Sequence, residues 1–168
     1  MADMEAADVL QVLGWLSAAG VKVHVAGGWA VDALVGEQSR RHADLDLAFD
    51  AADEQRVLMI LRGAGFQMTT DERPARFVLQ DQIGHQVDLH PVAFDASGNG
   101  QQVGFGRDTY DYPATEFGRG IIGGQEVGCL SAKLLIQFHV GYEPTDKDIN
   151  DMELLRDRLG IPLPAPYR

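Results

Sequence analysis

The chain contains a single cysteine, Cys129, in 168 residues. One thiol excludes an internal disulfide and a cysteine-rich zinc site, and it fits a reducing compartment, so we expect Cys129 to be a buried core residue. Long apolar runs are also missing: none reaches the roughly eighteen residues of a membrane span, and residues 1–5 lack the features of a secretion signal. The sequence therefore predicts a cytoplasmic protein that does not enter a membrane.

Positive charge is scarce as well. The chain has 14 Lys and Arg against 25 Asp and Glu, which gives a net charge of −11. Such a field repels the phosphate backbone of nucleic acid, so a polymerase is disfavoured and no nucleic-acid partner is expected. The same balance favours a cationic small molecule in a carboxylate-lined cleft, although a need for solubility alone also explains an acidic surface.

The rest of the composition is that of an ordinary globular protein. Apolar residues make up 45% of the chain and charged residues 23%, which is enough to bury a core and argues against disorder. The length fits one domain over residues 1–168, and no internal repeat or change of composition marks a second. The sequence leaves the oligomeric state open, a homodimer included.

The N-terminal half of the sequence predicts alternating helices and strands. Apolar residues recur at helical spacing in the helices, and Asp50 with Asp53 forms a capping pair for the third. Asp44–Phe49 alternates acidic and apolar residues, as a strand with one buried face does. In chain order we expect a helix over 5–19, a strand over 21–26, a helix over 29–35, a strand over 44–49 and a helix that is capped by Asp50 and ends at Gly63 or Gly65.

The C-terminal half begins with strands and ends with helices. Residues 95–106 are rich in Gly, Ser, Asn and Gln, and this composition predicts a long mobile loop. Ser131 caps one later helix, and Thr145 with Asp148 forms a capping pair for the last. We expect a hairpin of strands over 76–80 and 85–94, short strands over 115–122 and 125–130, and a C-terminal helical pair over 131–160.

Three aspartates lie on predicted strands. Asp44 and Asp46 are two residues apart, so their side chains share one face of the strand, about 6.6–7 Å apart along it. Asp88, on a later strand, can converge on the same face. Magnesium takes oxygen ligands, commonly one or two carboxylates completed by water and substrate phosphates. We therefore expect Asp44 and Asp46 to bind Mg²⁺, while Asp88 is either a third metal ligand or the general base for an acceptor hydroxyl.

A phosphate site is expected beside these carboxylates. Gly27-Gly28 joins a strand to a helix without side chains, so backbone N–H groups at the helix N-terminus can face an anion. Arg40 and His42 lie just before the aspartates and can add charge-assisted contacts, and Lys133, in the first turn of its helix, is a further candidate. This set fits a nucleoside triphosphate as co-substrate, because phosphoryl transfer mainly requires positioning and charge neutralisation.

The order of these motifs resembles that of the nucleotidyltransferase superfamily that includes DNA polymerase beta. Within it, the sequence is similar to the small antibiotic nucleotidyltransferases, most of all to the lincosamide nucleotidyltransferases and next to the aminoglycoside 2''-adenylyltransferases. The segments that carry the similarity are Gly27–Asp32, Arg40–Asp46, Val87–Pro91 and Phe138–Tyr142. The resemblance spans roughly residues 5–158 and is weakest between residues 95 and 120.

The resemblance implies an α+β, polymerase-beta-like fold, in which a mixed β-sheet is flanked by helices. It implies transfer of a nucleoside monophosphate to a hydroxyl of a small-molecule antibiotic, with Asp44 and Asp46 as magnesium ligands, Gly28 and Arg40 near the triphosphate and Asp88 as the base. The acceptor stays open between the two drug classes. The motifs are closer to those of the lincosamide nucleotidyltransferases, which favours lincosamide-like substrates. Residues 105–117 offer both aromatic rings and carboxylates for the acceptor pocket.

Several alternatives to this interpretation remain. An enzyme of the same fold that modifies RNA or protein is one, although the acidic charge argues against RNA; a catalytically silent nucleotide-binding module is another. Gly118–Gly123 matches a dinucleotide fingerprint, but no helix is expected after it, so we reject that reading. A zinc site with His85 and His90 is also rejected, because an odd spacing puts the two rings on opposite faces of a strand.

Overall fold

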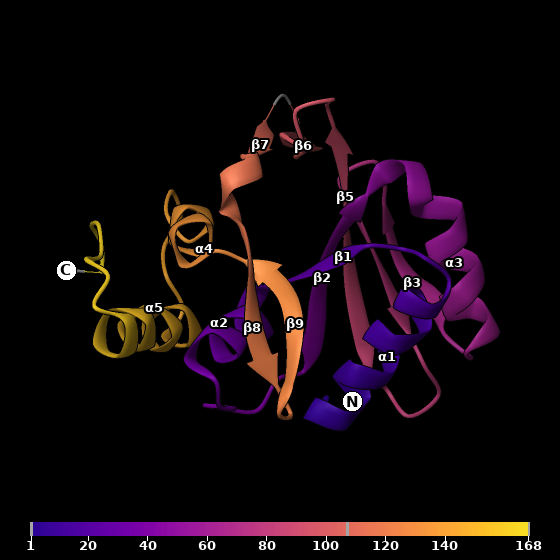
Figure 1. The fold of residues 1–168 in the computed structure, drawn as a ribbon, viewed down its shortest axis with the longest axis horizontal. Coiled ribbons are helices and arrows are strands. Elements are labelled where there is room, and N and C mark those ends of the chain that lie inside the picture. Colours follow the sequence, from indigo (N-terminus) through magenta and orange to yellow (C-terminus); the bar gives the residue numbers. More distant parts are fainter. Residues whose placement is uncertain (1, 107, 168) are drawn as a thin grey trace.

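The protein, described here by a computed structural model over residues 2–106 and 108–167, is built on one mixed sheet (Figure 1). The strands that follow one another along the sheet are, in spatial order, β3 (Gln67–Glu72), β4 (Arg76–Gln80), β5 (Gln86–Phe94), β2 (Asp44–Asp50), β1 (Val23–Ala26), β9 (Gln125–Leu130) and β8 (Phe117–Ile122). The parallel pairs are β2 with β5 and β1 with β9. Strands β6 (Gly100–Val103) and β7 (Thr109–Tyr112) form a hairpin that extends from β5.

Helices flank this sheet, as the sequence predicted. In Figure 1, α1 (Ala6–Ala18) and α3 (Glu54–Gly63) lie to the right, and α4 (Ala132–Phe138) and α5 (Asp146–Leu159) form the C-terminal pair to the left. Helix α2 (Gly27–Val35) follows β1 directly and packs against β8 and α5. Gly120 allows the close approach of β8, because a Cβ there would lie 2.5 Å from the carbonyl oxygen of Ala33.

Along β2 and β5, buried apolar side chains alternate with partly buried polar ones, so one face of these strands packs in the core and the other faces the site. Leu45, Leu47, Val87 and Leu89 are fully buried in the apolar core, which also contains Cys129, as expected. The residues between them are polar and only partly buried. Because neighbouring side chains on a strand point to opposite faces, the packing that anchors these two strands also presents their polar residues on the other face.

Two predicted elements differ from the structure. Residues 95–106 are not a long loop, since Gly100–Val103 forms β6 and pairs with both β5 and β7. The strand was missed because its buried positions are Gly100 and Gln102 and not apolar residues. The helix expected from Asp50 starts later, at Glu54, because Asp50 caps a single 3₁₀ turn over Ala51–Asp53 by accepting a hydrogen bond from the backbone N–H of Ala52.

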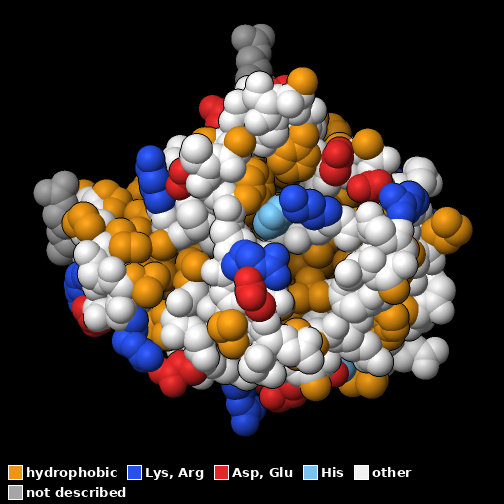
Figure 2. Space-filling model, viewed as in Figure 1, with side chains coloured by type: hydrophobic (Ala, Val, Ile, Leu, Met, Phe, Trp, Pro, Cys, Tyr) orange, Lys and Arg blue, Asp and Glu red, His pale blue; other side chains and the backbone are white. Residues whose placement is uncertain are grey.

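The surface mixes charges of both signs with apolar side chains. On the face shown in Figure 2, basic side chains stand apart between acidic and apolar ones, and the described residues form no continuous basic band there. None of the helices within the described ranges has the length and apolar character needed to cross a membrane.

Candidate active site

The pairing of β2 with β5 brings the three predicted aspartates together. Asp46 and Asp88 are register partners on these parallel strands, and Asp44 lies two residues before Asp46 on the same face. Burial raises the pKa of Asp44 to about 6, with the charges of Asp46 and Asp88 adding to it. The pKa of Asp88 is raised as well, chiefly by burial. Both raised pKa values indicate that the three carboxylates lie close together in a site that is partly shielded from water.

These residues fit a divalent cation. Atom Oδ1 of Asp88 is buried and has no hydrogen-bond partner among the described residues. Ligand atoms of Asp46, Asp88 and His90 all lie within 4.8 Å of one another, close enough for one ion to contact them. Carboxylate oxygens are the ligands that Mg²⁺ prefers, and a bound cation would relieve the repulsion between the aspartates.

Two further residues complete this cluster, and the sequence analysis did not assign either of them. Nε2 of His90 lies 3.2 Å from Oδ1 of Asp46 and 3.6 Å from Oδ1 of Asp88. Arg76, on β4, contacts the other oxygen of Asp88 through Nη1 at 2.9 Å. His85 lies elsewhere and pairs with Asp81. The spacing rule that joined Asp44 to Asp46 also places His90 on the face of Asp88, so this histidine was within reach of sequence reasoning.

The turn at Gly27-Gly28 lies directly against the carboxylate of Asp46. Gly27 has a φ of 60°, and a Cβ there would lie 2.2 Å from Oδ2 of Asp46, so only glycine fits. At Gly28 a Cβ would lie 2.4 Å from Nη2 of Arg40 and 2.8 Å from Nδ1 of His42. The N-terminus of α2, Arg40 and His42 therefore meet at one point beside Asp46. Positive partial charge and N–H donors gather there, as anion binding requires.

Buried carboxylates hold both of these side chains. Asp151, on α5, accepts hydrogen bonds from Nε and Nη2 of Arg40 at 2.9 and 2.8 Å. Nε2 of His42 lies 2.5 Å from Oδ2 of Asp32, and both side chains are only 2% exposed. Ser39 also donates to Asp32. Neither aspartate was assigned from the sequence: Asp151 lies far along the chain from Arg40, and Asp32, although it ends the segment Gly27–Asp32, was given no role there.

Lys133 lies apart from this cluster. Its side chain is exposed on α4 and does not line the main cavity, whereas Lys147, on α5, is close enough to Asp44 for its charge to lower the pKa of that carboxyl. Arg40 lowers it in the same way. The cations that act on Asp44 therefore come from the segment before β2 and from α5, whereas the cation on Asp88 is Arg76 of β4.

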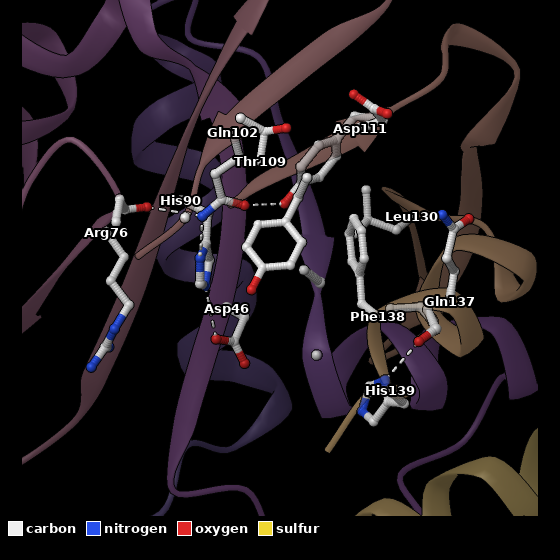
Figure 3. A pocket seen from close by; sticks show the side chains of 18 of the residues that line it. Asp46, Arg76, His90, Gln102, Thr109, Asp111, Leu130, Gln137, Phe138 and His139 are labelled. Carbon is white, nitrogen blue, oxygen red and sulfur yellow. Dashed lines mark hydrogen bonds and ion pairs between the residues drawn. The ribbon is translucent and has the colours of Figure 1, made fainter. Parts of the chain in front are cut away.

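A cavity of about 630 Å³ opens next to Asp46 and His90 (Figure 3). The β6–β7 hairpin forms one wall and the end of α4, with the loop after it, forms the other. Aromatic side chains dominate both walls: Tyr110 and Tyr112 meet Phe138 edge-on, with ring centroids 5.8 and 5.1 Å apart. From residues 105–117, the rings that line the cavity are Phe105, Tyr110 and Tyr112, and the carboxylate that does so is Asp111.

Comparisons with known proteins agree with this geometry. A lincosamide resistance protein of Staphylococcus haemolyticus is 30% identical over 130 residues, covering 77% of this chain and 81% of that protein. The crystal structure of the lincosamide antibiotic adenylyltransferase LnuA, lincomycin-bound, has a TM-score of 0.84 at 26% identity, over 92% of this chain and 98% of that one. The crystal structure of ANT(2'')-Ia with adenylyl-2''-tobramycin shares the fold, with a TM-score of 0.74 at 21% identity over 92% and 89% of the two chains.

The family assignment follows from these matches. The sequence model of the aminoglycoside-2''-adenylyltransferase family covers residues 8–155. Together with the structural match to LnuA, it confirms the resemblance, the polymerase-beta-like fold and the enzyme class that were predicted from the sequence. The chain therefore belongs to the aminoglycoside-2''-adenylyltransferase family of antibiotic-modifying nucleotidyltransferases.

Proposed function

We propose that this protein is a Mg²⁺-dependent enzyme that transfers a nucleoside monophosphate from a nucleoside triphosphate to a hydroxyl of a lincosamide-like antibiotic, releasing pyrophosphate. The observation that carries the proposal is the meeting of Asp44, Asp46 and Asp88 beside Gly27 at the start of α2. Carboxylates for a cation and N–H donors for phosphate lie side by side, which is what phosphoryl transfer requires of a protein.

The site has a nucleotide side and an acceptor side. We define the nucleotide side as Gly27, Gly28, Arg40 and His42. The Gly27-Gly28 turn and Arg40 receive the triphosphate, and the buried His42 packs against Gly28 and supports the turn. Asp44 and Asp46 hold Mg²⁺, which neutralises phosphate charge when bound. We define the acceptor side as the aromatic walls of the cavity, formed by Tyr110, Tyr112 and Phe138 with their neighbours. Asp46 and His90 lie where the two sides meet.

The proposed reaction is an in-line displacement at the α-phosphorus. The acceptor hydroxyl oxygen forms the new P–O bond, the bond to the β-phosphate oxygen breaks, and pyrophosphate leaves. Asp88 takes the hydroxyl proton in this scheme. Its raised pKa, caused chiefly by burial, makes it a better proton acceptor than an ordinary carboxylate.

The acceptor class is proposed from the lining of the cavity. A polycationic aminoglycoside gains most from several spread carboxylates, whereas a lincosamide has one amine and an apolar arm and needs an apolar wall. Of the acidic residues between 105 and 117, Asp111 lines the cavity, while Glu116 is bonded to Thr115 and Ser131. Apart from Asp46 of the proposed metal site, Asp111 is the carboxylate in this lining, and it stands beside several rings, which favours the lincosamide-like acceptor. The two lincosamide-related proteins above support it.

Pyrophosphate release tests the proposal directly. We expect Mg²⁺- and nucleotide-dependent release with lincomycin as acceptor, and only mild loss of kcat/KM between low and high salt, because a singly charged substrate has little electrostatic steering to lose. Steeply salt-sensitive turnover of tobramycin, with none of lincomycin, would contradict the acceptor class. Absence of release with every acceptor and nucleotide would contradict the reaction itself.

Asp88→Asn separates the base from a metal ligand. A residue that acts only as the base should leave Mg²⁺-nucleotide affinity near normal in calorimetry while turnover falls by about 10²–10⁴. If nucleotide affinity falls together with turnover, Asp88 coordinates the metal.

A further inference from the structure

A chain of buried hydrogen bonds runs from the acceptor side to the carboxylates (Figure 3). The hydroxyl of Tyr112 donates to Oε1 of Gln102 at 2.5 Å. Nε2 of Gln102 donates to the carbonyl oxygen of Ala75 at 2.9 Å and lies 3.2 Å from Nδ1 of His90. The other ring nitrogen of His90 then meets Asp46. Three strands, β7, β6 and β5, thus link the aromatic wall to β2.

The partners of Gln102 determine which way its amide points. A backbone carbonyl can only accept a hydrogen bond, so the amide atom 2.9 Å from the oxygen of Ala75 must be the nitrogen. The reversed amide would place two acceptor oxygens in contact. The second N–H of the same amide is then directed at Nδ1 of His90, which must accept. A neutral imidazole with an accepting Nδ1 carries its proton on Nε2.

The burial of Gln102 stabilises this orientation of its amide. Gln102 is 7% exposed and Tyr112 is 3% exposed, whereas Gln101 and Val103 on either side point outward. An amide in such a place is costly unless both of its ends are bonded, and here both are. A buried glutamine on an edge hairpin, paired at each end, is better explained as an orienting group than as core packing.

We propose that Gln102 and Tyr112 are positioning residues that fix His90 as an Nε2–H donor to Asp46. His90 thereby orients the carboxylate of Asp46 and stays outside the ligand set of the metal, because its Nε2 has no free lone pair. The orientation follows from the contacts alone, and its consequence for turnover rests on the proposed function. Since Tyr112 also contacts Phe138 across the cavity, the acceptor wall and the carboxylates belong to one network.

The tautomer of His90 can be measured without any activity. Long-range ¹H–¹⁵N NMR distinguishes the two ring nitrogens, and the chain has only five histidines, so loss of one signal set in His90→Gln assigns the ring. We expect a protonated Nε2 and an unprotonated Nδ1, unchanged when Mg²⁺ is added. An Nδ1–H tautomer, a doubly protonated ring, or an Nε2 shift typical of metal coordination would overturn the proposal, whether or not the enzyme turns over.

Substitutions test the consequence for turnover. Gln102→Met keeps the size of the side chain and removes both amide partners, so the ring is free to change tautomer. We expect kcat to fall by about 10–100-fold, the usual cost of losing a partner that orients a metal site, with the KM for nucleotide changed much less. The ratio of Mn²⁺-supported to Mg²⁺-supported activity should rise, because an imidazole lone pair can now join the ligands.

Gln125→Met is the matched control, because it makes the same change at an exposed position of β9, away from the cavity. It should leave kcat, the metal ratio and the His90 signals at wild-type values. Tyr112→Phe keeps the ring but removes its donor, and it should shift the same three readouts by less than Gln102→Met. If Gln102→Met does not fold, Tyr112→Phe carries the test; wild-type behaviour of both variants in all three readouts would overturn the proposal.

Discussion

The nucleotide side and the acceptor side of the cleft are held in place in different ways. Arg40 and His42 are each bonded to a carboxylate whose side chain is 4% and 2% exposed, respectively. On the acceptor side, Tyr110 and Phe105 are 43% and 59% exposed, and the ring of Tyr110 is supported by that of Phe138. Electrostatic stabilisation is most effective when the charged groups are already held in position before the substrate binds, as on the nucleotide side. The apolar wall of the acceptor side needs only an approximate fit to the shape of its ligand.

This difference predicts that substitutions on the two sides change the kinetics in different ways. A change on the nucleotide side should lower turnover with every acceptor alike, because each acceptor uses the same phosphate and metal positions. A change on the acceptor side should alter the KM for one class of acceptor and leave that for the nucleotide unchanged.

Gly27→Ala should be the most damaging small change on the nucleotide side. The added methyl would lie 2.2 Å from Oδ2 of Asp46, in a backbone conformation with a φ of 60° that alanine adopts poorly. Moving a carboxylate by about 1 Å at a reacting centre commonly costs about 10²-fold, so we expect at least that loss in kcat/KM with every acceptor. Gly14→Ala is the control: nothing lies within 4 Å of its Cβ, and activity should not change. Near-normal turnover of Gly27→Ala would show that Asp46 tolerates displacement.

Asp151→Asn should weaken the nucleotide side through Arg40. The guanidinium then loses its charged partner, 111 residues away in sequence, and is no longer held beside Gly28. We expect the KM for nucleotide to rise about tenfold, in the range found when an outer partner of a binding residue is removed. Asp157→Asn makes the same change at an exposed position of α5 and should be silent. An acceptor-dependent effect of Asp151→Asn would break the contrast between the two sides.

The same two sides explain what could be predicted from the sequence. Asp44, Asp46 and Asp88 were found because a strand's period of two and a Gly-Gly turn are local patterns, and the resemblance then supplied the fold. Asp32 and Asp151 were missed because their partners come from other elements. The β6–β7 hairpin was missed because Gln102 occupies a core-facing position with a polar side chain, which only its three tertiary partners make favourable.

Tyr110→Ala tests the acceptor side. The ring lines the cavity and meets Phe138 edge-on, so its removal takes away apolar contact but no charge. We expect the KM for lincomycin to rise by about 2- to 10-fold, since one aromatic contact contributes about 0.5–1.5 kcal/mol, while the KM for nucleotide stays constant. Tyr110→Phe keeps the ring and should behave like the wild type. A rise in the nucleotide KM in Tyr110→Ala would mean that the two sides are not independent.

The smallest expected effect concerns stability and not turnover, and it tests how the carboxylates are held without metal. Asp44 has a pKa of about 6 in the folded protein against an ordinary value of 3.8, because burial and the charges of Asp46 and Asp88 disfavour its ionised form. The folded state therefore binds this proton more tightly than the unfolded chain. Its contribution to stability is fully present below pH 4 and is lost as the pH rises through about 6.

Asp44→Asn removes this titration, so in EDTA the variant should be more stable than the wild type above pH 6, by on the order of 1–2 kcal/mol once partial exposure is allowed for. The advantage should shrink as the pH falls and vanish near pH 4. Urea unfolding of both proteins between pH 4 and pH 8 measures the difference. Adding Mg²⁺ at pH 8 should favour the wild type, because an ion that binds only the folded state stabilises it. If the unfolding free energies of the two proteins in EDTA instead change with pH in parallel, the ionised Asp44 is not repelled by its neighbours. That result would contradict the electrostatic argument for a cation beside Asp44.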